Sequence, residues 1–167
     1  METARLFSDI PLSINIRFIL FGGEEAGLKG SRYYVSKLSD SDKQNIVANI
    51  NLDYIGEEGE SNLIIATIDG RENAATELFK EFINSGKINV IKAPRSDYYS
   101  FAKAGIPPLS IGQLPIPWII NIEDGKIYTE EDFKNDHKKF NSITRLDHEK
   151  LNLAINMVIK VLSEYMY

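Results

Sequence analysis

Ile14-Asn15-Ile16-Arg17-Phe18-Ile19-Leu20-Phe21-Gly22-Gly23-Glu24-Glu25 is the stretch of sequence from which the fold is predicted. The run from Ile14 to Phe21 is almost continuously apolar and rich in β-branched and aromatic residues, which predicts a strand buried on both faces. A helical pattern follows. Two adjacent carboxylates at the carboxyl end of such a strand lie at the edge of an α/β sheet where ligands usually bind. Glu24 and Glu25 are therefore candidate functional residues, since neighbours at a strand end point in different directions and one can hold a metal while the other handles a proton.

One other interpretation of this acidic pair stays open, and a second can be excluded. Glu24 and Glu25 could be solvated acids at a helix N-terminus, stabilised by free N–H groups and the helix dipole. A phosphate-binding loop is excluded, because Lys29 does not directly follow the glycine as that motif requires and two glutamates would repel a phosphate. Other motifs of the sequence are needed to distinguish functional carboxylates from solvated ones at Glu24 and Glu25.

Length and composition predict one ordinary globular domain. The chain has 167 residues, of which 43% are hydrophobic and 26% charged. A net charge of −5 without a basic patch argues against a nucleic-acid partner, and no apolar run is long enough for a membrane span. Since there is no cysteine, a metal would have to be bound by carboxylates and by the two histidines, His137 and His148. The N-terminal residues lack the pattern of a signal peptide.

Helical and strand patterns alternate along the chain, which implies a three-layer α/β domain. Helical spacing covers 2–8, 26–38, 73–85, 96–104 and 147–165, and strand patterns cover 14–22, 46–53, 63–68, 88–91 and 106–111. Asp53 ends the second strand pattern, so a third carboxylate is expected at the ligand edge of the sheet. The prolines of the last strand favour a sheet edge or a strand start, and 114–135 is predicted to be irregular.

Four ordered motifs resemble those of the M28 family of zinc aminopeptidases. They are Gly23-Glu24-Glu25-Ala26-Gly27-Leu28-Lys29-Gly30-Ser31, Asn51-Leu52-Asp53-Tyr54-Ile55-Gly56, Ser96-Asp97-Tyr98-Tyr99-Ser100-Phe101 with Gly105-Ile106-Pro107, and a late His137. The resemblance runs from about residue 2 to the C-terminus. It implies an α/β/α fold of the zinc-exopeptidase type, with a mixed, mostly parallel sheet, and it identifies 1–167 as a single, partial, N-terminally truncated peptidase domain.

The resemblance also implies roles for individual residues. Glu24 is expected to be the general base, and Glu25, Asp53 and His137 are expected to be ligands in a site that holds a pair of zinc ions. Zinc accepts carboxylate and imidazole ligands, lowers the pKa of bound water and polarises a carbonyl. The implied substrate is a peptide with a free N-terminus. Tyr98 and Trp118 are candidates for its pocket, with plain packing as the alternative for each.

Members of this family take two further ligands from upstream, a histidine in a His-x-Asp motif and an aspartate that bridges the metals. Neither is present in these 167 residues. Such a chain is expected to have an incomplete metal site and to expose a sheet edge and apolar surface, which favours self-association.

Three hypotheses for function follow. The chain is part of a metal-dependent aminopeptidase, a non-catalytic remnant or binding module on the same scaffold, or a glutaminyl-cyclase-like acyltransferase that uses a single zinc. Family members are often exported, but the sequence leaves the location of this chain open.

Overall fold

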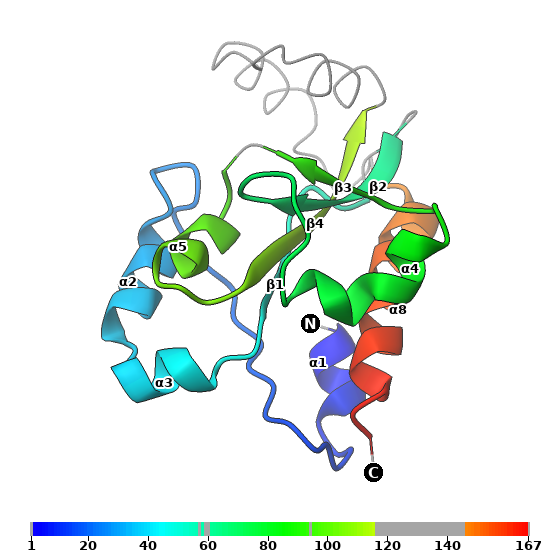
Figure 1. Cartoon of the computed structure of the whole chain (residues 1–167). Coiled ribbons are helices and arrows are strands. Elements are labelled where there is room, and N and C mark those ends of the chain that lie inside the picture. The colour runs from blue at the N-terminus through cyan, green and yellow to red at the C-terminus, as the bar shows by residue number, and fades with distance from the viewer. Residues whose placement is uncertain (1, 57, 59–60, 94, 116–145, 167) are drawn as a thin grey trace.

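The computed structural model describes residues 2–56, 58, 61–93, 95–115 and 146–166. In this part of the chain, helices α1 (Glu2–Phe7), α2 (Lys29–Lys37) and α3 (Asp40–Asn45) precede the first strand, β1 (Asn49–Leu52). Then follow β2 (Ser61–Thr67), the 3-10 helix η1 (Thr76–Phe79), α4 (Lys80–Asn84), β3 (Asn89–Lys92), α5 (Tyr98–Lys103), β4 (Pro108–Pro115) and α8 (His148–Ser163). Figure 1 shows these elements in chain order.

The described strands form a four-stranded mixed sheet in the order β1-β4-β2-β3. β1 pairs with β4 in parallel, β2 pairs with β3 in parallel, and β2 and β4 run antiparallel. β4 is thus an inner strand, and its prolines stand at its ends: Pro108 begins it and Pro115 is its last residue. Of the two positions predicted for the prolines, the strand start is the one that Pro108 occupies.

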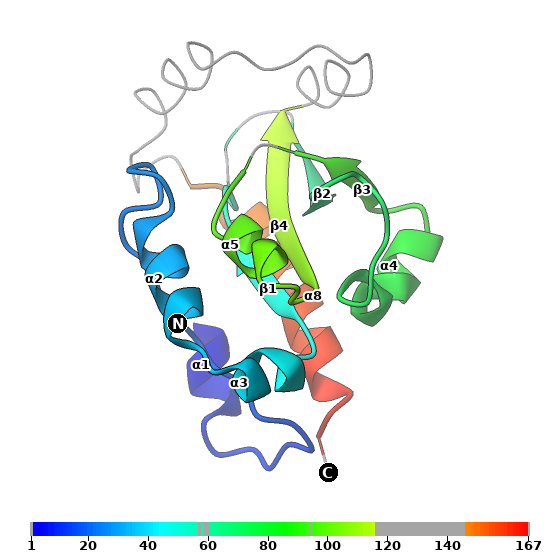
Figure 2. The same ribbon diagram turned by 60° about the vertical axis from the view of Figure 1, so that its left-hand side comes forward.

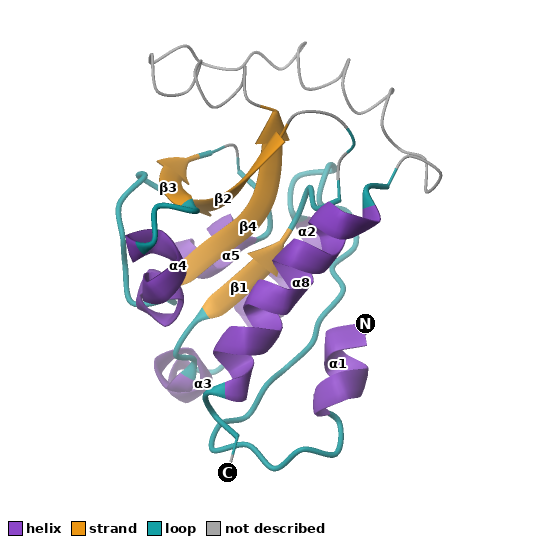
Figure 3. Ribbon diagram, turned by 90° about the vertical axis from the view of Figure 1, so that its right-hand side faces the viewer, coloured by secondary structure: helices purple, strands orange, loops and turns teal. Residues whose placement is uncertain are grey.

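Helices cover both faces of this sheet, which confirms the three-layer α/β/α prediction. α8, α1, η1 and α4 lie on one face, while α2 and α5 lie on the other (Figures 2 and 3). The main core joins the first face to β2 and β4 through residues such as Ile65, Phe79, Leu109, Ile111 and Val161. A second cluster under α2 and α5 contains Val35, Leu38, Phe101 and Ile106.

Polar side chains define where two of the helices begin. Ser39 and Asp42 form a reciprocal capping box at the start of α3. Asp147 caps α8 by accepting hydrogen bonds from the backbone amides of Glu149 and Lys150, at 3.0 and 3.1 Å. His148 is the first residue of α8 and is exposed. None of the helices in the described residues is both long and apolar enough to cross a bilayer.

The strand predicted at 14–22 is wrong for the described structure. This segment is an extended connection between α1 and α2, tied down at its start by a bridge between Leu12 and Met166 and by a 2.8 Å hydrogen bond from the Ser13 amide to the Tyr165 carbonyl. Residues 14–22 make no strand ladder with the described strands. A strand requires a hydrogen-bonded neighbour as well as an apolar sequence, and none of the described strands pairs with this segment.

Candidate active site

Glu24 and Glu25 lie in a tight loop immediately before α2. The amides of Gly27 and Leu28 both donate to the Glu24 carbonyl, at 2.9 and 2.7 Å, and the Gly30 amide donates to the Gly22 carbonyl at 3.0 Å. Gly30 is required there, since a Cβ atom at this position would be 2.6 Å from the Gly22 oxygen. Because α2 begins at Lys29 and has no acid in its first turn, the interpretation of the pair as helix N-terminal acids is wrong.

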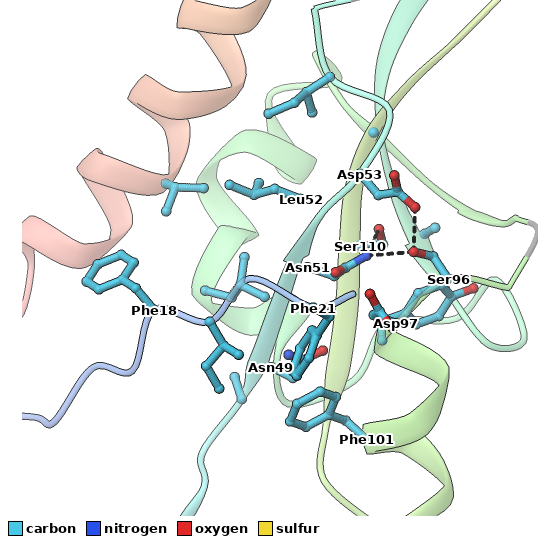
Figure 4. Close-up of a pocket in the computed structure, with 18 of the residues that line it drawn as sticks. Phe18, Phe21, Asn49, Asn51, Leu52, Asp53, Ser96, Asp97, Phe101 and Ser110 are labelled. Atoms are coloured by element: carbon cyan, nitrogen blue, oxygen red, sulfur yellow. Dashed lines mark hydrogen bonds between the residues drawn. The ribbon is translucent and has the colours of Figure 1, made fainter. Parts of the chain in front are cut away.

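Asp53 follows β1 and is fixed by a chain of polar side chains. The Ser96 hydroxyl donates a hydrogen bond to the Asp53 carboxylate. The side-chain amide of Asn51 donates to the hydroxyls of Ser96, at 3.1 Å, and Ser110, at 3.0 Å. Figure 4 shows this network, which joins β1, β4 and the residues before α5 at one end of the sheet. The orientation of Asp53 is therefore set by side chains from three separate parts of the sequence.

Tyr54, the residue after Asp53, has a backbone conformation that is uncommon outside glycine, with φ of 60°. β4 holds it in place: the Gln113 amide donates to the Tyr54 carbonyl at 2.8 Å, and the Asp53 amide donates to the Ile111 carbonyl at 3.2 Å. Such conformations cost about 1–3 kcal/mol and cluster at functional sites. The backbone next to Asp53 is thus held in a strained form by the neighbouring strand.

Three neighbouring carboxylates act on Glu24 at this end of the sheet. Burial raises the pKa of Glu24 to about 7, and the negative charges of Asp53, Asp97 and Glu25 act in the same direction. Asp97 is only 8% exposed; burial raises its pKa, while a hydrogen bond with Ser31 acts against this. The Oδ1 atom of Asp97 is buried and has no hydrogen-bond partner in the described part of the chain. The site therefore concentrates negative charge that a cation would neutralise.

The residue types at this site match those that bind zinc, because carboxylate oxygens are among its usual ligands. The Oδ1 of Asp97, which has no partner among the described residues, and the charge repulsion at Glu24 both fit a site for a cation. However, the described residues contain no group of three or more His, Cys, Asp or Glu side chains placed to bind one metal ion. A three-ligand set therefore needs donors beyond the described residues, where His137 lies.

The comparison with protein families decides the assignment. The model of peptidase family M28 matches residues 1–162. This chain belongs to peptidase family M28. As an M28 chain it is 32% identical to Aminopeptidase YwaD of Bacillus subtilis over 98% of its own length. It is 26% identical to Leucine aminopeptidase 2 of Trichophyton rubrum over 99% of its length.

Solved structures agree with this assignment. An aminopeptidase from Aneurinibacillus sp. strain AM-1 is 29% identical and superposes with a TM-score of 0.77, covering 99% of this M28 chain and 37% of its own. BSAP, a zinc aminopeptidase from Bacillus subtilis, is 28% identical with a TM-score of 0.76, covering 99% and 39%. The M28 chain spans 35% of YwaD and 36% of the Trichophyton protein, about a third of the length of these relatives.

The structure places some of the sequence-predicted site residues and not others. Glu24, Glu25 and Asp53 line one cavity, whereas His137 and Trp118 lie outside the described residues. Tyr98 lies at the wall of the same cavity but is 1% exposed, and its hydroxyl donates to the Ala93 carbonyl at 3.3 Å. Its role in substrate binding stays a prediction.

Sequence reasoning gave no role to Ser96, to the side chain of Asn51 or to Asp97. Their motifs were visible in the sequence, but no spacing rule joins a serine to an aspartate 43 positions away.

Proposed function

We propose that this chain supplies the acidic part of a zinc aminopeptidase site, which hydrolyses the N-terminal bond of a peptide. The observation that carries the proposal is the convergence of Glu24, Asp53 and Asp97 from three separate elements on one cavity, with the pKa of Glu24 raised to about 7. A carboxylate whose pKa lies near the working pH is suited to accept and return a proton. The aminopeptidase names of the relatives support the same class of reaction.

In this proposal Glu24 is the general base. It would take the proton of the attacking water and deliver it to the leaving amine, and its partial burial raises its proton affinity for that purpose. Glu25, Asp53 and His137 would hold zinc, two ions in a complete site. When bound, zinc polarises the scissile carbonyl and makes water a better nucleophile. Ser96 and Asn51 would keep Asp53 in one orientation through the hydrogen bonds between them.

A non-catalytic scaffold is the second candidate. It is favoured by the described residues themselves, among which no three metal-binding side chains come together. In this alternative the chain keeps the carboxylates Glu24, Asp53 and Asp97 at the sheet edge but does not bind zinc tightly.

Metal content and activity together separate the two candidates. The chain is loaded with zinc, freed of loosely bound ions and analysed for zinc per polypeptide, and then assayed on a leucyl peptide with a free or an acetylated N-terminus. We expect tightly bound zinc, and hydrolysis of the free peptide only. Glu24→Gln should keep the zinc and lose at least about 100-fold in kcat, while Glu72→Gln, an exposed acid outside the cavity, should change neither. A chain that holds no zinc and cleaves neither peptide is the scaffold.

A further inference from the structure

The turn at residues 53–56, which we call the β1 turn, directly follows β1 and is bound to β4 by Gln113. The backbone amide of Gln113 donates to the Tyr54 carbonyl at 2.8 Å. The side-chain carbonyl of Gln113 also accepts a hydrogen bond from the backbone amide of Gly56. A single residue of β4 therefore holds the turn both through its backbone and through its side chain.

The backbone of the β1 turn requires such support. Tyr54 has φ of 60° and Gly56 has φ of 82°, both in the left-handed region. A residue other than glycine rarely adopts this conformation, and it persists only where the surrounding structure imposes it. The Gly56 carbonyl accepts a further 2.9 Å hydrogen bond from the Asp147 amide, so the turn is fixed between β4 and the start of α8.

A glycine of β4 allows the turn to approach this closely. A Cβ atom at Gly112 would lie 2.9 Å from the carbonyl oxygen of Asp53, which is closer than real Cβ contacts allow. The residue before Gly112, Ile111, accepts a 3.2 Å hydrogen bond from the Asp53 amide through its carbonyl. The backbone of Asp53 is thus in direct contact with β4, and its position follows that of the turn.

Gln113 acts on the site through the β1 turn and not by direct contact. Its side chain is 1% exposed. Asp53, Tyr54 and Gly56 line the cavity, whereas Gln113 is not among the described residues that do. Burying an amide is costly unless its hydrogen bonds are made. An unbranched apolar residue would fill the same place without that cost, but it could not accept the hydrogen bond from Gly56.

We propose that Gln113 is a positioning residue for Asp53, because its side-chain carbonyl holds the β1 turn in the form that presents the Asp53 carboxylate to the cavity. The inference rests on the proposed function only for the role of Asp53 as a zinc ligand. Ser96 fixes the carboxylate itself through a hydrogen bond (Figure 4). Gln113 fixes the backbone that carries this carboxylate, and a metal ligand needs both to be held in place.

The first test uses nuclear magnetic resonance on the isotopically labelled chain without metal. Gln113→Met keeps an unbranched side chain of similar size but removes the acceptor for the Gly56 amide. We expect hydrogen exchange of that amide to become at least about tenfold faster. We also expect Asp53 to have one χ1 rotamer in the wild-type chain and several in Gln113→Met, as read from three-bond couplings to its carboxyl carbon.

The matched control is Thr67→Val on β2. Thr67 is also 1% exposed, its hydroxyl donates to the Arg71 carbonyl at 2.9 Å, and it is not among the described residues that line the cavity. Thr67→Val loses a buried hydrogen bond but should leave Gly56 and Asp53 as they are in the wild type. Urea denaturation of both variants separates a loss of stability from a change at Asp53.

The second test is zinc affinity, measured by isothermal titration. Gln113→Met should bind zinc about 10–100-fold more weakly than the wild type, the usual effect of losing a residue that orients a ligand. Thr67→Val should bind zinc as the wild type does. If the wild-type chain binds no zinc, the proposed function fails at that step, while the rotamer of Asp53 still decides the role of Gln113.

Three results would overturn the proposal. They are an Asp53 rotamer that is unchanged in Gln113→Met, an equal effect of Thr67→Val on Asp53, and a zinc affinity that Gln113→Met leaves at the wild-type value. If Gln113→Met does not fold, Gln113→Asn takes its place, since it keeps the amide group and shortens its reach by one methylene. The same changes at Gly56 and Asp53 are expected there, and their absence overturns the proposal.

Discussion

The hydroxyl of Ser96 donates a hydrogen bond to the carboxylate of Asp53, although 43 positions separate them in the sequence. Ser96 in turn accepts a 3.1 Å hydrogen bond from Asn51. The orientation of a proposed zinc ligand thus depends on a residue that precedes α5, on the opposite face of the sheet from α8.

Ser96→Ala should weaken zinc binding about 10–100-fold, the usual cost of losing a hydrogen bond that orients a ligand. Ser96→Thr keeps the hydroxyl and should restore most of the affinity. Isothermal titration with zinc measures both. Ser36→Ala removes an exposed serine hydroxyl from α2 and is the matched control. Equal affinities for Ser96→Ala and Ser36→Ala would show that Asp53 needs no such support.

Glu24→Gln should change how the stability of the metal-free chain depends on pH. The pKa of Glu24 is raised from 4.5 to about 7, so the folded state binds more protons than the unfolded state between these values. Glu24 therefore contributes its full stabilisation of the folded state below pH 4.5. This stabilisation declines as the pH rises and is lost above about pH 7. The Tm of Glu24→Gln relative to wild type should therefore increase from pH 4.5 to about pH 7. Thermal unfolding in the presence of a chelator measures this, and a difference that does not vary with pH contradicts it.

Tyr98→Phe tests whether Tyr98 is a packing residue or a substrate ligand. Its ring is buried, burial raises the pKa of its hydroxyl to about 12, and that hydroxyl donates to Ala93. Loss of the hydroxyl should lower the free energy of unfolding by about 1 kcal/mol, as measured by urea denaturation. KM for a peptide substrate should stay the same. An increase in KM without loss of stability would instead give Tyr98 the binding role predicted from the sequence.

Asp147→Ala removes the N-cap of α8 and should lower the free energy of unfolding by about 1 kcal/mol. Two backbone amides lose their acceptor, those of Glu149 and Lys150. Asp147→Ser keeps a capping oxygen and should be close to wild type in the same urea experiment. A stability loss that is equal in both variants would assign the effect to the charge of Asp147 and not to capping.

Local patterns in the sequence were sufficient for most of the fold. The apolar stripe from Leu151 to Leu162 and the cap at Asp147 predict α8 to within a few residues, because helix formation depends on neighbours three and four positions apart. The segment Ile14–Phe21 has a strand-like sequence for the same local reason. Whether it becomes a strand depends on a partner, which periodicity cannot reveal.

The candidate site likewise has some features that local sequence predicts and others that only the folded structure shows. Glu24, Glu25 and Asp53 stand at chain positions that a motif can identify. Three features arise from packing between distant segments: the hydrogen bond between Ser96 and Asp53, the Asp97 oxygen that has no partner among the described residues, and the left-handed backbone of Tyr54. Only the folded arrangement of β1, β4 and α5 reveals them.

The inner position of β4 has a consequence for the order in which the chain matures on the ribosome. Among the described strands, β1 has β4 as its partner, and β4 also joins β1 to the β2-β3 pair. Translation must therefore pass Ile111 before β1 can complete its pairing with β4, and α8, which covers one face, emerges later still. Pairings between distant segments form slowly and leave apolar strands exposed meanwhile. During synthesis β1 therefore stays without its β4 partner, and the face that α8 covers stays open, until these later residues have emerged.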